Sequence, residues 1–515
     1  MTDNKRIAKN TIFMYVRMIF VMVVSLYTSR VVLHTLGVED YGTYQVVGGI
    51  VGFLSILNTT LSTGTSRFLM FELGAGDKER LQKTFSTLLN AHYALAIVVV
   101  ILAETIGLWF VYNKLIIPAN RMNAAIVTYH ISVLTAFFGL TQTPYSASIK
   151  SHERMDIYAY TSIIEVSAKL LIVYLLAISP IDKLVFYAIL LAIVSIAMMI
   201  FYRWYCVHKF QECRYSFSFD KRIFIQVTSY CGWNLFSNTA GVLNSQGMII
   251  LLNMFFNPGV VTALSVATTV KNAANSFVEN YRVASVPQIV KQYAAGDFEN
   301  SKKLVLSSTK YSYFLLFLMG LPIFLVSPEL LMIWLKIVPD YSVIFLRFII
   351  VICFFELFNG GFYTAINAVG RIREYSIIYP TVMFLCFPVV YFSFKMDYSP
   401  IAVTVVMLVA NAIISLIVMP LLVVKIANYS FKEIYDLFKT CLFVTLPSLP
   451  IPFMVYYFLQ GEGIWMKFLL TTVTSVANVV LCVWFIGIDH EMRSRIISFV
   501  KSKIQNNGLF QADKK

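Results

Sequence analysis

Residues Gln288 to Lys310 read QIVKQYAAGDFENSKKLVLSSTK, and an earlier stretch, Phe68 to Asn90, reads FLMFELGAGDKERLQKTFSTLLN. Each stretch contains a Gly-Asp turn, followed by a basic amphipathic run that leads into an apolar segment. The two aspartates, Asp77 and Asp297, lie 220 positions apart. The apolar segments upstream of them align at the same offset without a gap. The chain is therefore predicted to consist of two related halves in one orientation.

The composition predicts the class of the protein. The chain is 58% hydrophobic and 13% charged, with a mean hydropathy of +0.73, whereas soluble proteins are about half apolar and about a quarter charged. A membrane-spanning helix needs about 20 apolar residues, because its backbone groups can form hydrogen bonds only within the helix there. The short alternating strands of a barrel are not visible. The prediction is an all-α integral membrane protein.

The apolar segments predict fourteen transmembrane helices. The N-terminal lobe, 1–207, has six, at roughly 10–36, 42–66, 85–112, 123–148, 157–178 and 183–207. The C-terminal lobe, 223–424, has six, at roughly 223–254, 260–285, 308–333, 341–368, 375–395 and 400–424. Residues 208–222 are predicted to be the cytoplasmic connection between the lobes. Two additional helices, near 437–459 and 463–487, have no repeat partner, and 488–515 is a basic tail predicted to lie on the cytoplasmic side.

The distribution of lysine and arginine predicts the orientation. One alternating set of loops, together with the termini, holds 27 of these residues, and the opposite set holds 6. Because basic loops remain on the cytoplasmic side, both termini are predicted to be cytoplasmic. The net charge of +14 follows mostly from this asymmetry, which favours anionic membrane lipids as partners rather than nucleic acid.

Familiar enzyme and cofactor motifs are not visible in the sequence. The seven cysteines and six histidines form no Cys-x-x-Cys, no His-Glu-x-x-His and no paired ligand spacing, and no phosphate-binding glycine loop precedes a Lys-Ser or Lys-Thr. We therefore predict no metal, no cofactor and no enzymatic activity. A coupling ion cannot be named from the sequence.

The eighth predicted span carries a polar stripe. Lys271 lies near its middle, and Asn275, Glu279 and Arg282 follow on the same side at about 100° per residue. The preceding span carries a second stripe that includes Asn234 and Asn238. Charged groups within the bilayer face a bundle interior or a wet cavity. We predict that these residues line a cavity, and the alternative is polar packing between helices.

Other basic residues lie within predicted spans. Arg17 and Arg30 are in the first span and Arg347 is in the tenth, whereas Arg67 and Arg203 can instead reach the cytoplasmic interface. Lys169 follows Glu165 by four residues, which predicts an internal ion pair on one helix face. The charged groups predicted to face the interior are mostly basic. Such an interior favours an anionic passenger, and arginine suits phosphate through its planar fork.

These residues carry a resemblance to a known family. The opening NTIFMYVRMIF, the first turn RVVLHTLGVEDYGTYQVV, its second-half counterpart and the two Gly-Asp loops resemble the polysaccharide flippases of the multidrug/oligosaccharidyl-lipid/polysaccharide exporter superfamily. The resemblance covers roughly residues 5 to 430, and the last two helices match only in number. It implies a MATE-like fold of two six-helix lobes with alternating access. The implied location is the bacterial inner membrane.

The resemblance also implies a passenger. This would be an undecaprenyl-diphosphate-linked oligosaccharide, an O-antigen or capsule unit for example, moved from the cytoplasmic to the periplasmic leaflet, with polysaccharide polymerase machinery as a partner. Related lipid II flippases hold the diphosphate with basic residues of the first, second and eighth helices, which here correspond to Arg17 or Arg30, Arg67 and Lys271. The acid beside their first-helix arginine is absent here, so the resemblance does not carry ion coupling over to this chain.

Three alternatives stay open. A multidrug or cation-coupled antiporter of the same superfamily would need a buried acid, for which Glu279, Glu356 and Glu104 are the candidates. A membrane polymerase or ligase would need a large outer loop with catalytic basic residues, and none is visible. A scaffold that transports nothing would not need charges at mid-bilayer.

Overall fold

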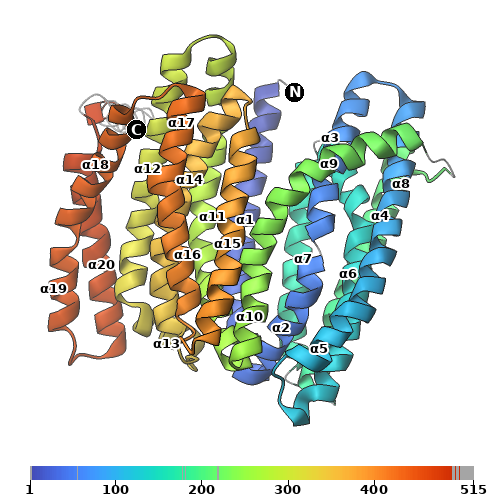
Figure 1. Cartoon of the computed structure of the whole chain (residues 1–515), viewed down its shortest axis with the longest axis horizontal. Helices are drawn as coiled ribbons and strands as arrows, with labels where there is room; N and C mark the ends of the chain where they lie inside the picture. The colour runs from blue at the N-terminus through green and yellow to red at the C-terminus, as the bar shows by residue number, and fades with distance from the viewer. Residues whose placement is uncertain are drawn as a thin grey trace, which may run out of the picture. The chain divides into compact units, whose positions relative to one another are not determined.

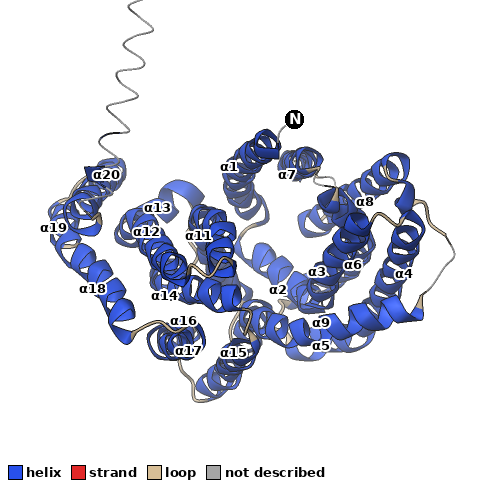
Figure 2. Cartoon of the chain, turned by 90° about the horizontal axis from the view of Figure 1, so that it is seen from above, coloured by secondary structure: helices blue, strands red, loops and turns tan. Residues whose placement is uncertain are grey.

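The fold is all-helical in the part of the chain that the structure, a computed structural model, describes (Figure 1). The described residues are 3–54, 56–152, 154–176, 178–179, 181–216, 220–489, 493–494 and 498. Within these ranges the side chains of some helical residues, including 3–16 and 228–238, lie outside the description. The described ranges contain no strand (Figure 2). The predicted fold class, an all-α membrane protein, is confirmed.

The helices of the first predicted lobe follow one another with short connections. Their bounds are α1 (Asp3–Leu36), α2 (Val38–Leu54), α3 (Ile56–Ala75), α4 (Lys78–Leu102), the π-helical turn η1 (Ala103–Gly107), α5 (Leu108–Lys114), the 3₁₀ turn η2 (Ala119–Arg121), α6 (Met122–Ser151), α7 (Met155–Leu176) and α8 (Lys183–Lys209). The 3₁₀ turn η3 (Gln211–Cys213) then begins the predicted connection.

The remaining helices continue in the same manner. Their bounds are α9 (Lys221–Val242), η4 (Leu243–Gly247), α10 (Met248–Phe255), α11 (Pro258–Ala294), α12 (Phe298–Leu325), α13 (Ser327–Leu335), α14 (Ser342–Val369), α15 (Arg373–Lys395), α16 (Ala402–Ile413), η5 (Ile414–Val418), α17 (Met419–Ala427), α18 (Phe431–Ser448), α19 (Pro450–Phe458), α20 (Ile464–Cys482) and η6 (Val483–Gly487). The π-helical turns η4, η5 and η6 continue the helices that precede them.

Eleven helical stretches in the described part of the chain are long and apolar enough to cross a membrane. They overlap eleven of the predicted spans. The other three predictions, at 42–66, 223–254 and 260–285, fall on α2–α3, on α9–α10 and on α11, where some side chains, and residue 55 itself, lie outside the description. The count of fourteen therefore stays a prediction.

The two Gly-Asp turns have the same local structure. Gly76 and Gly296 have φ values of +77° and +80°, a left-handed conformation that glycine adopts without steric cost and that commonly ends a helix. Asp77 and Asp297 then cap α4 and α12, because each side chain accepts a hydrogen bond from a backbone amide of the first turn, at 3.0 and 3.3 Å. Each Gly-Asp turn therefore ends one helix and caps the next.

The described chain divides into two compact units. Unit 1 comprises Met1–Ala273, Trp334–Phe345 and Arg373–Ala410, and unit 2 comprises Ala274–Ile333, Leu346–Ile372 and Asn411–Lys515. Helix α11 contributes residues to both units. The predicted lobes 1–207 and 223–424 have different boundaries from these units and stay a prediction.

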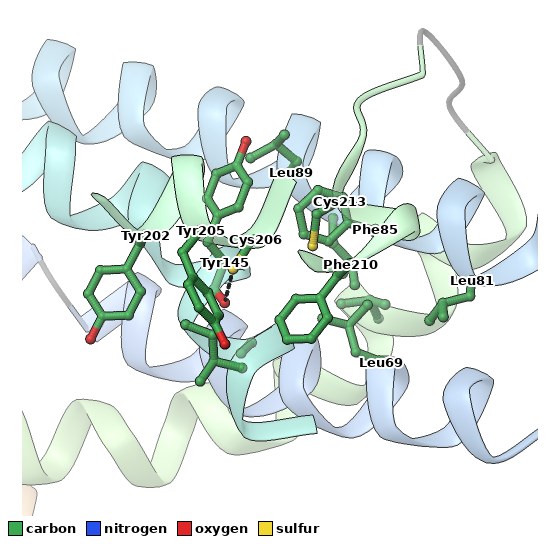
Figure 3. Close-up of a cluster of buried hydrophobic side chains, with 14 of the residues drawn as sticks. Leu69, Leu81, Phe85, Leu89, Tyr145, Tyr202, Tyr205, Cys206, Phe210 and Cys213 are labelled. Carbon is green, nitrogen blue, oxygen red and sulfur yellow. Dashed lines mark hydrogen bonds between the residues drawn. The ribbon is translucent and has the colours of Figure 1, made fainter. Parts of the chain in front are cut away.

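Unit 1 is a bundle in which α6 packs against α4 and α8, and α1 packs against α7 (Figure 2). The side chains that join α3, α4, α6, α8 and η3 form a buried cluster (Figure 3). In this cluster the Sγ of Cys206 donates a hydrogen bond to the carbonyl oxygen of Tyr145 at 3.4 Å, and Phe85 lies edge-on to the Tyr145 ring at 5.4 Å. The cluster holds the first residues of the predicted connection against the bundle.

The predicted connection is attached to unit 1 at several points. The ring of Phe210 stacks on His152 at 4.0 Å, and the Nε2 of His152 lies 2.5 Å from a carboxylate oxygen of Glu212. The Gln82 side chain donates a hydrogen bond to the backbone oxygen of Arg214 at 2.8 Å. Burial alone would raise the pKa of Glu212, but the hydrogen bonds from His152 and from the backbone outweigh it, and the pKa of this carboxyl is lowered.

Two ion pairs anchor the last helices in unit 2. Helix α12 packs against both α18 and α20. Near the middle of α12, the Nζ of Lys310 lies 2.9 Å from Asp489, and beyond the C-terminal end of α12 the Nζ of Lys467 lies 2.7 Å from Glu329. The two added helices are joined by Asn478, which donates to the backbone oxygen of Ser448 at 2.9 Å. They are therefore an integral part of unit 2.

Candidate functional site

The ten predicted site residues fall into three groups. The side chains of Arg67, Asn234 and Asn238 lie outside the described residues. Unit 1 contains Arg17, Arg30 and Lys271, and unit 2 contains Asn275, Glu279, Arg282 and Arg347. That all ten surround one cavity stays a prediction.

The four residues of the predicted polar stripe, Lys271, Asn275, Glu279 and Arg282, all lie on one unbroken helix, α11 (Pro258–Ala294). Lys271 and Asn275 are half-buried. Arg282 forms an ion pair with Glu279, at 2.7 and 2.8 Å from its two oxygens. A Cβ atom on Gly360 of α14 would overlap the Arg282 guanidinium. Arg282 therefore packs closely on α14, and Glu279 neutralises its charge.

Arg347 caps the end of a helix. Its Nε donates to the carbonyl oxygen of Phe324 at 3.2 Å, and its guanidinium carbon lies 5.7 Å from the centre of the Phe324 ring. Phe324 is the penultimate residue of α12, where backbone oxygens lack helical partners and where a cation is favoured. This contact gives Arg347 a structural role between α14 and α12.

The arginines of α1 have a different environment. The guanidinium carbon of Arg17 lies 4.7 Å from the centre of the Tyr158 ring on α7, and the Nζ of Lys150 lies 4.6 Å from the same centre. The Nε of Arg17 is buried without a hydrogen-bond acceptor. Within the described part of the chain, neither cation has an acidic partner, and Arg30 has neither a hydrogen bond nor an ion pair. Arg17, Arg30 and Lys150 thus have no acidic partner among the described residues.

A polar cavity of about 480 Å³ lies within unit 1. Helices α2, α6, α7 and α8 line it. The Nζ of Lys169 and an oxygen of Glu165, both on α7, form an ion pair of 2.6 Å in its wall, so the predicted pair is confirmed. Other polar lining residues are Tyr44, Ser132, Thr135, Gln142 and Ser195. The cavity can therefore hold a polar molecule at membrane depth.

The sequence alone did not predict this cavity. The four-residue spacing of Glu165 and Lys169 predicted an internal ion pair, and spacing along one helix does not show which residues lie opposite. A usable signal was present: Tyr158, Glu165 and Lys169 are seven and four residues apart and share one face of α7. For α6, the sequence showed no similar row of polar residues on one helix face that would have marked Gly139 and Gln142 as cavity residues.

A second cavity of about 480 Å³ in unit 1 is almost purely apolar. Its lining comes from α2, α4, η1, α5, η4, α10 and α15 and includes Phe53, Phe110 and Phe387. Two π-helical turns border it, ending at Gly107 and Gly247. With no polar side chain to orient a ligand except the Tyr391 hydroxyl, this cavity suits hydrocarbon.

Comparisons with known proteins identify the fold. No protein-family model and no curated protein matches the chain. A solved structure of the lipid II flippase MurJ in an inward closed conformation is similar, with a TM-score of 0.70, 14% identity, and 92% of this chain and 97% of that chain covered. An inward-facing multidrug resistance MATE family transporter has a TM-score of 0.68 at 13% identity, covering 79% and 96%. A superfamily transporter from Pyrococcus furiosus has a TM-score of 0.60 at 13% identity, covering 82% and 97%. The chain therefore has the fold of these transporters.

The three structures match different shares of this chain, which bears on the C-terminal segment. The residues that precede α18 number 430 of the 515. Because 92% of the chain exceeds 430 residues, the match to the lipid II flippase must include part of the segment that contains α18–α20. The 79% and 82% covered by the other two transporters can be reached without it. The match to the lipid II flippase is therefore the one of the three whose coverage requires part of this segment.

Proposed function

We propose that the protein is a flippase that moves an undecaprenyl-diphosphate-linked oligosaccharide from the cytoplasmic to the periplasmic leaflet of a bacterial inner membrane. Both termini would be cytoplasmic, and access would alternate between the two faces, as inverted or repeated bundles allow. O-antigen, capsule and exopolysaccharide units are the passengers in question. Polysaccharide polymerase machinery would act on the product at the periplasmic face.

The observation that carries this proposal is the uncompensated charge of α1. A cation at membrane depth is costly unless an anion or a wet cavity accompanies it. Arg17 and Arg30 have no acidic partner among the described residues, and the buried Nε of Arg17 has no acceptor. An anionic passenger would provide both the charge and the acceptor. A diphosphate fits, because its oxygens match the planar donor fork of arginine.

Two further observations support a lipid-linked passenger. The match to the lipid II flippase extends into the last two helices, whereas the matches to the multidrug transporters need not. The apolar cavity offers room for hydrocarbon within unit 1. The other two basic residues that the resemblance assigns to the diphosphate, Arg67 and Lys271, are proposed to complete its site.

The direct test is export in cells. The chain would be expressed in a strain whose own flippase gene is deleted, with surface polysaccharide and lipid-linked intermediates measured together. Arg17→Ala and Arg30→Ala are expected to lower surface polysaccharide about tenfold, the effect of losing about 1.4 kcal/mol of binding, while the lipid-linked intermediate accumulates. The control is Lys114→Ala, an exposed lysine in α5. Normal export by both arginine variants at wild-type protein levels would rule the proposal out.

The second candidate function is a multidrug or cation-coupled antiporter. One observation favours it: the wall of the polar cavity contains an acid, Glu165, which would bind a cationic passenger or a coupling cation that displaces its partner Lys169. Dye efflux from a strain that lacks its own exporters separates the two functions. Efflux that is lost in Glu165→Gln and kept in Arg17→Ala would favour the antiporter.

A further inference from the structure

Part of the wall of the polar cavity in unit 1 is formed by glycines that leave empty space beside them. Ideal Cβ atoms built on Gly48 of α2 and Gly139 of α6 would have nothing within 4 Å, and both glycines line the cavity. Ala136 and Ala188 are also in the lining. Small residues on facing helices therefore leave space that larger side chains would fill. A volume of about 480 Å³ lies within the usual range of pockets for small ligands.

The cavity contains polar groups that have no partner in the described protein. The Gln142 amide, the Ser195 hydroxyl and the Tyr44 hydroxyl line it without a hydrogen bond to another described residue. The hydroxyls of Ser132 and Thr135 donate to backbone oxygens one turn earlier, each at 2.8 Å, so their lone pairs are still free to accept. The wall thus offers donors and acceptors in a mixed arrangement.

The charge of the wall is balanced. Lys169 and Glu165 neutralise each other, and no other charged side chain lines the cavity. A phosphate would find no excess of positive charge there, and a cation would find no excess of negative charge. An uncharged ligand with many hydroxyl groups suits this wall, because it can donate to Glu165 and accept from Lys169 in charge-assisted hydrogen bonds. The Tyr44 ring can pack against an apolar face of such a ligand.

The polar cavity also lies close, along α7, to the two cations that contact Tyr158. Tyr158, which contacts the Arg17 and Lys150 cations, precedes Glu165 by seven residues on the same helix face. At 1.5 Å per residue the two positions are about 10 Å apart along the axis. Between these two positions, the hydroxyl of Thr161 on α7 lies 2.8 Å from the Tyr202 hydroxyl of α8. In a lipid-linked glycan the first sugar is bonded directly to the diphosphate.

We propose that this cavity is a glycan subsite, which binds the uncharged sugar nearest the diphosphate while the diphosphate is held by the cations around Tyr158. The inference rests on the proposed flippase function. It assigns Gln142, Glu165 and Lys169 to the sugar and Arg17 and Lys150 to the anion.

The test compares two lipids on the purified full-length protein. The probes are undecaprenyl diphosphate and the same lipid carrying one N-acetylglucosamine, and microscale thermophoresis measures the affinity for each. Wild-type protein is expected to bind the sugar-bearing lipid about tenfold more tightly, the effect of one or two net hydrogen bonds. Gly139→Leu is expected to abolish this preference and to leave the affinity for the bare lipid unchanged. The leucine fills open space, so the fold should tolerate it.

The matched control is Ala197→Leu, which adds the same side chain at an exposed position of α8 outside the cavity. It should retain the tenfold preference. A Gln142→Ala variant, which removes the amide without filling the space, should reduce the preference about threefold, the effect of about half a hydrogen bond's net contribution.

The possible outcomes separate the two proposals. Equal binding of the two lipids by the wild type, or an unchanged preference in Gly139→Leu, overturns the glycan subsite and leaves the flippase proposal standing. If the wild type binds neither lipid, the flippase proposal fails, and the subsite fails with it. Loss of binding to both lipids in Gly139→Leu, with wild-type thermal stability, would place the diphosphate itself in this cavity and also contradict the assignment.

Discussion

The guanidinium of Arg17 on α1 lies 4.7 Å from the centre of the Tyr158 ring on α7, and its buried Nε has no hydrogen-bond acceptor. A cation over an aromatic face gains about 0.5–2 kcal/mol, depending on how far it is desolvated. This contact holds the guanidinium in place while leaving its donors free. Tyr158 is thus positioned to orient Arg17 for an anionic ligand.

Tyr158 provides the first prediction. Tyr158→Leu removes the ring that Arg17 and Lys150 contact, so export is expected to fall about three- to tenfold, which corresponds to about 0.7–1.4 kcal/mol. Tyr158→Phe keeps the ring and should export like the wild type. Surface polysaccharide in the deletion strain is the readout, with Tyr112→Leu, an exposed ring in α5, as the control. Equal losses in the Phe and Leu variants would show that the hydroxyl, not the ring, matters.

The ion pair of Lys467 and Glu329 provides the second prediction. The Glu329 side chain is 5% exposed and that of Lys467 is 15% exposed, so removing one partner leaves a buried charge. Lys467→Met is expected to destabilise the protein by about 3 kcal/mol. The double variant Lys467→Met with Glu329→Gln should recover most of that loss. Thermal unfolding in detergent measures both, and additive losses would contradict the coupling.

The two ion pairs of Arg121, with Asp40 and with Asp182, provide the third prediction. Its guanidinium binds Asp40 at the start of α2 at 2.5 and 2.7 Å, and Asp182, which caps α8, at 2.5 and 3.1 Å. Arg121→Met leaves two partly buried carboxylates near each other and should cost about 1–3 kcal/mol, between the values for surface and buried pairs. The same thermal assay applies. The control Lys114→Met changes an exposed lysine of a neighbouring helix and should have little effect.

The contact of Glu212 with His152 provides the fourth prediction, a pH dependence. The pKa of Glu212 is lowered in the folded protein, so its contribution to stability is present above the unfolded pKa, about 4.3, and is lost as the pH falls through the lower folded value. The stability difference between the wild type and Glu212→Gln should therefore be largest near neutral pH and shrink in acid. A difference that grows as the pH falls below about 4.3 would contradict this assignment.

Part of the site follows from the sequence because it depends on one helix at a time. The four-residue spacing of Glu165 and Lys169 places them on one face, and the ion pair forms as predicted. The Gly-Asp turns cap α4 and α12 through local backbone contacts. The same reasoning places Glu279 and Arg282 on one face, where they pair.

Other residues could not be assigned without their neighbours. Arg347 was predicted to line the site, and the structure shows that it caps α12 through the backbone of Phe324, a residue 23 positions earlier. Arg282 packs on Gly360, and Tyr158 joins Arg17 to Lys150. Helical periodicity gives the direction of a side chain about its own axis and does not identify the helix that it meets.

By itself, the sequence determined that this protein lies in the membrane, that its chain is helical, where most spans fall and how the Gly-Asp turns end and begin helices. These properties depend on hydropathy and on contacts within a few residues, which the order of the residues specifies directly. Only the tertiary structure decided which charges are neutralised, and that four helices enclose a polar cavity beside Glu165. Those properties depend on which helices pack together, and packing joins residues that are far apart in the chain.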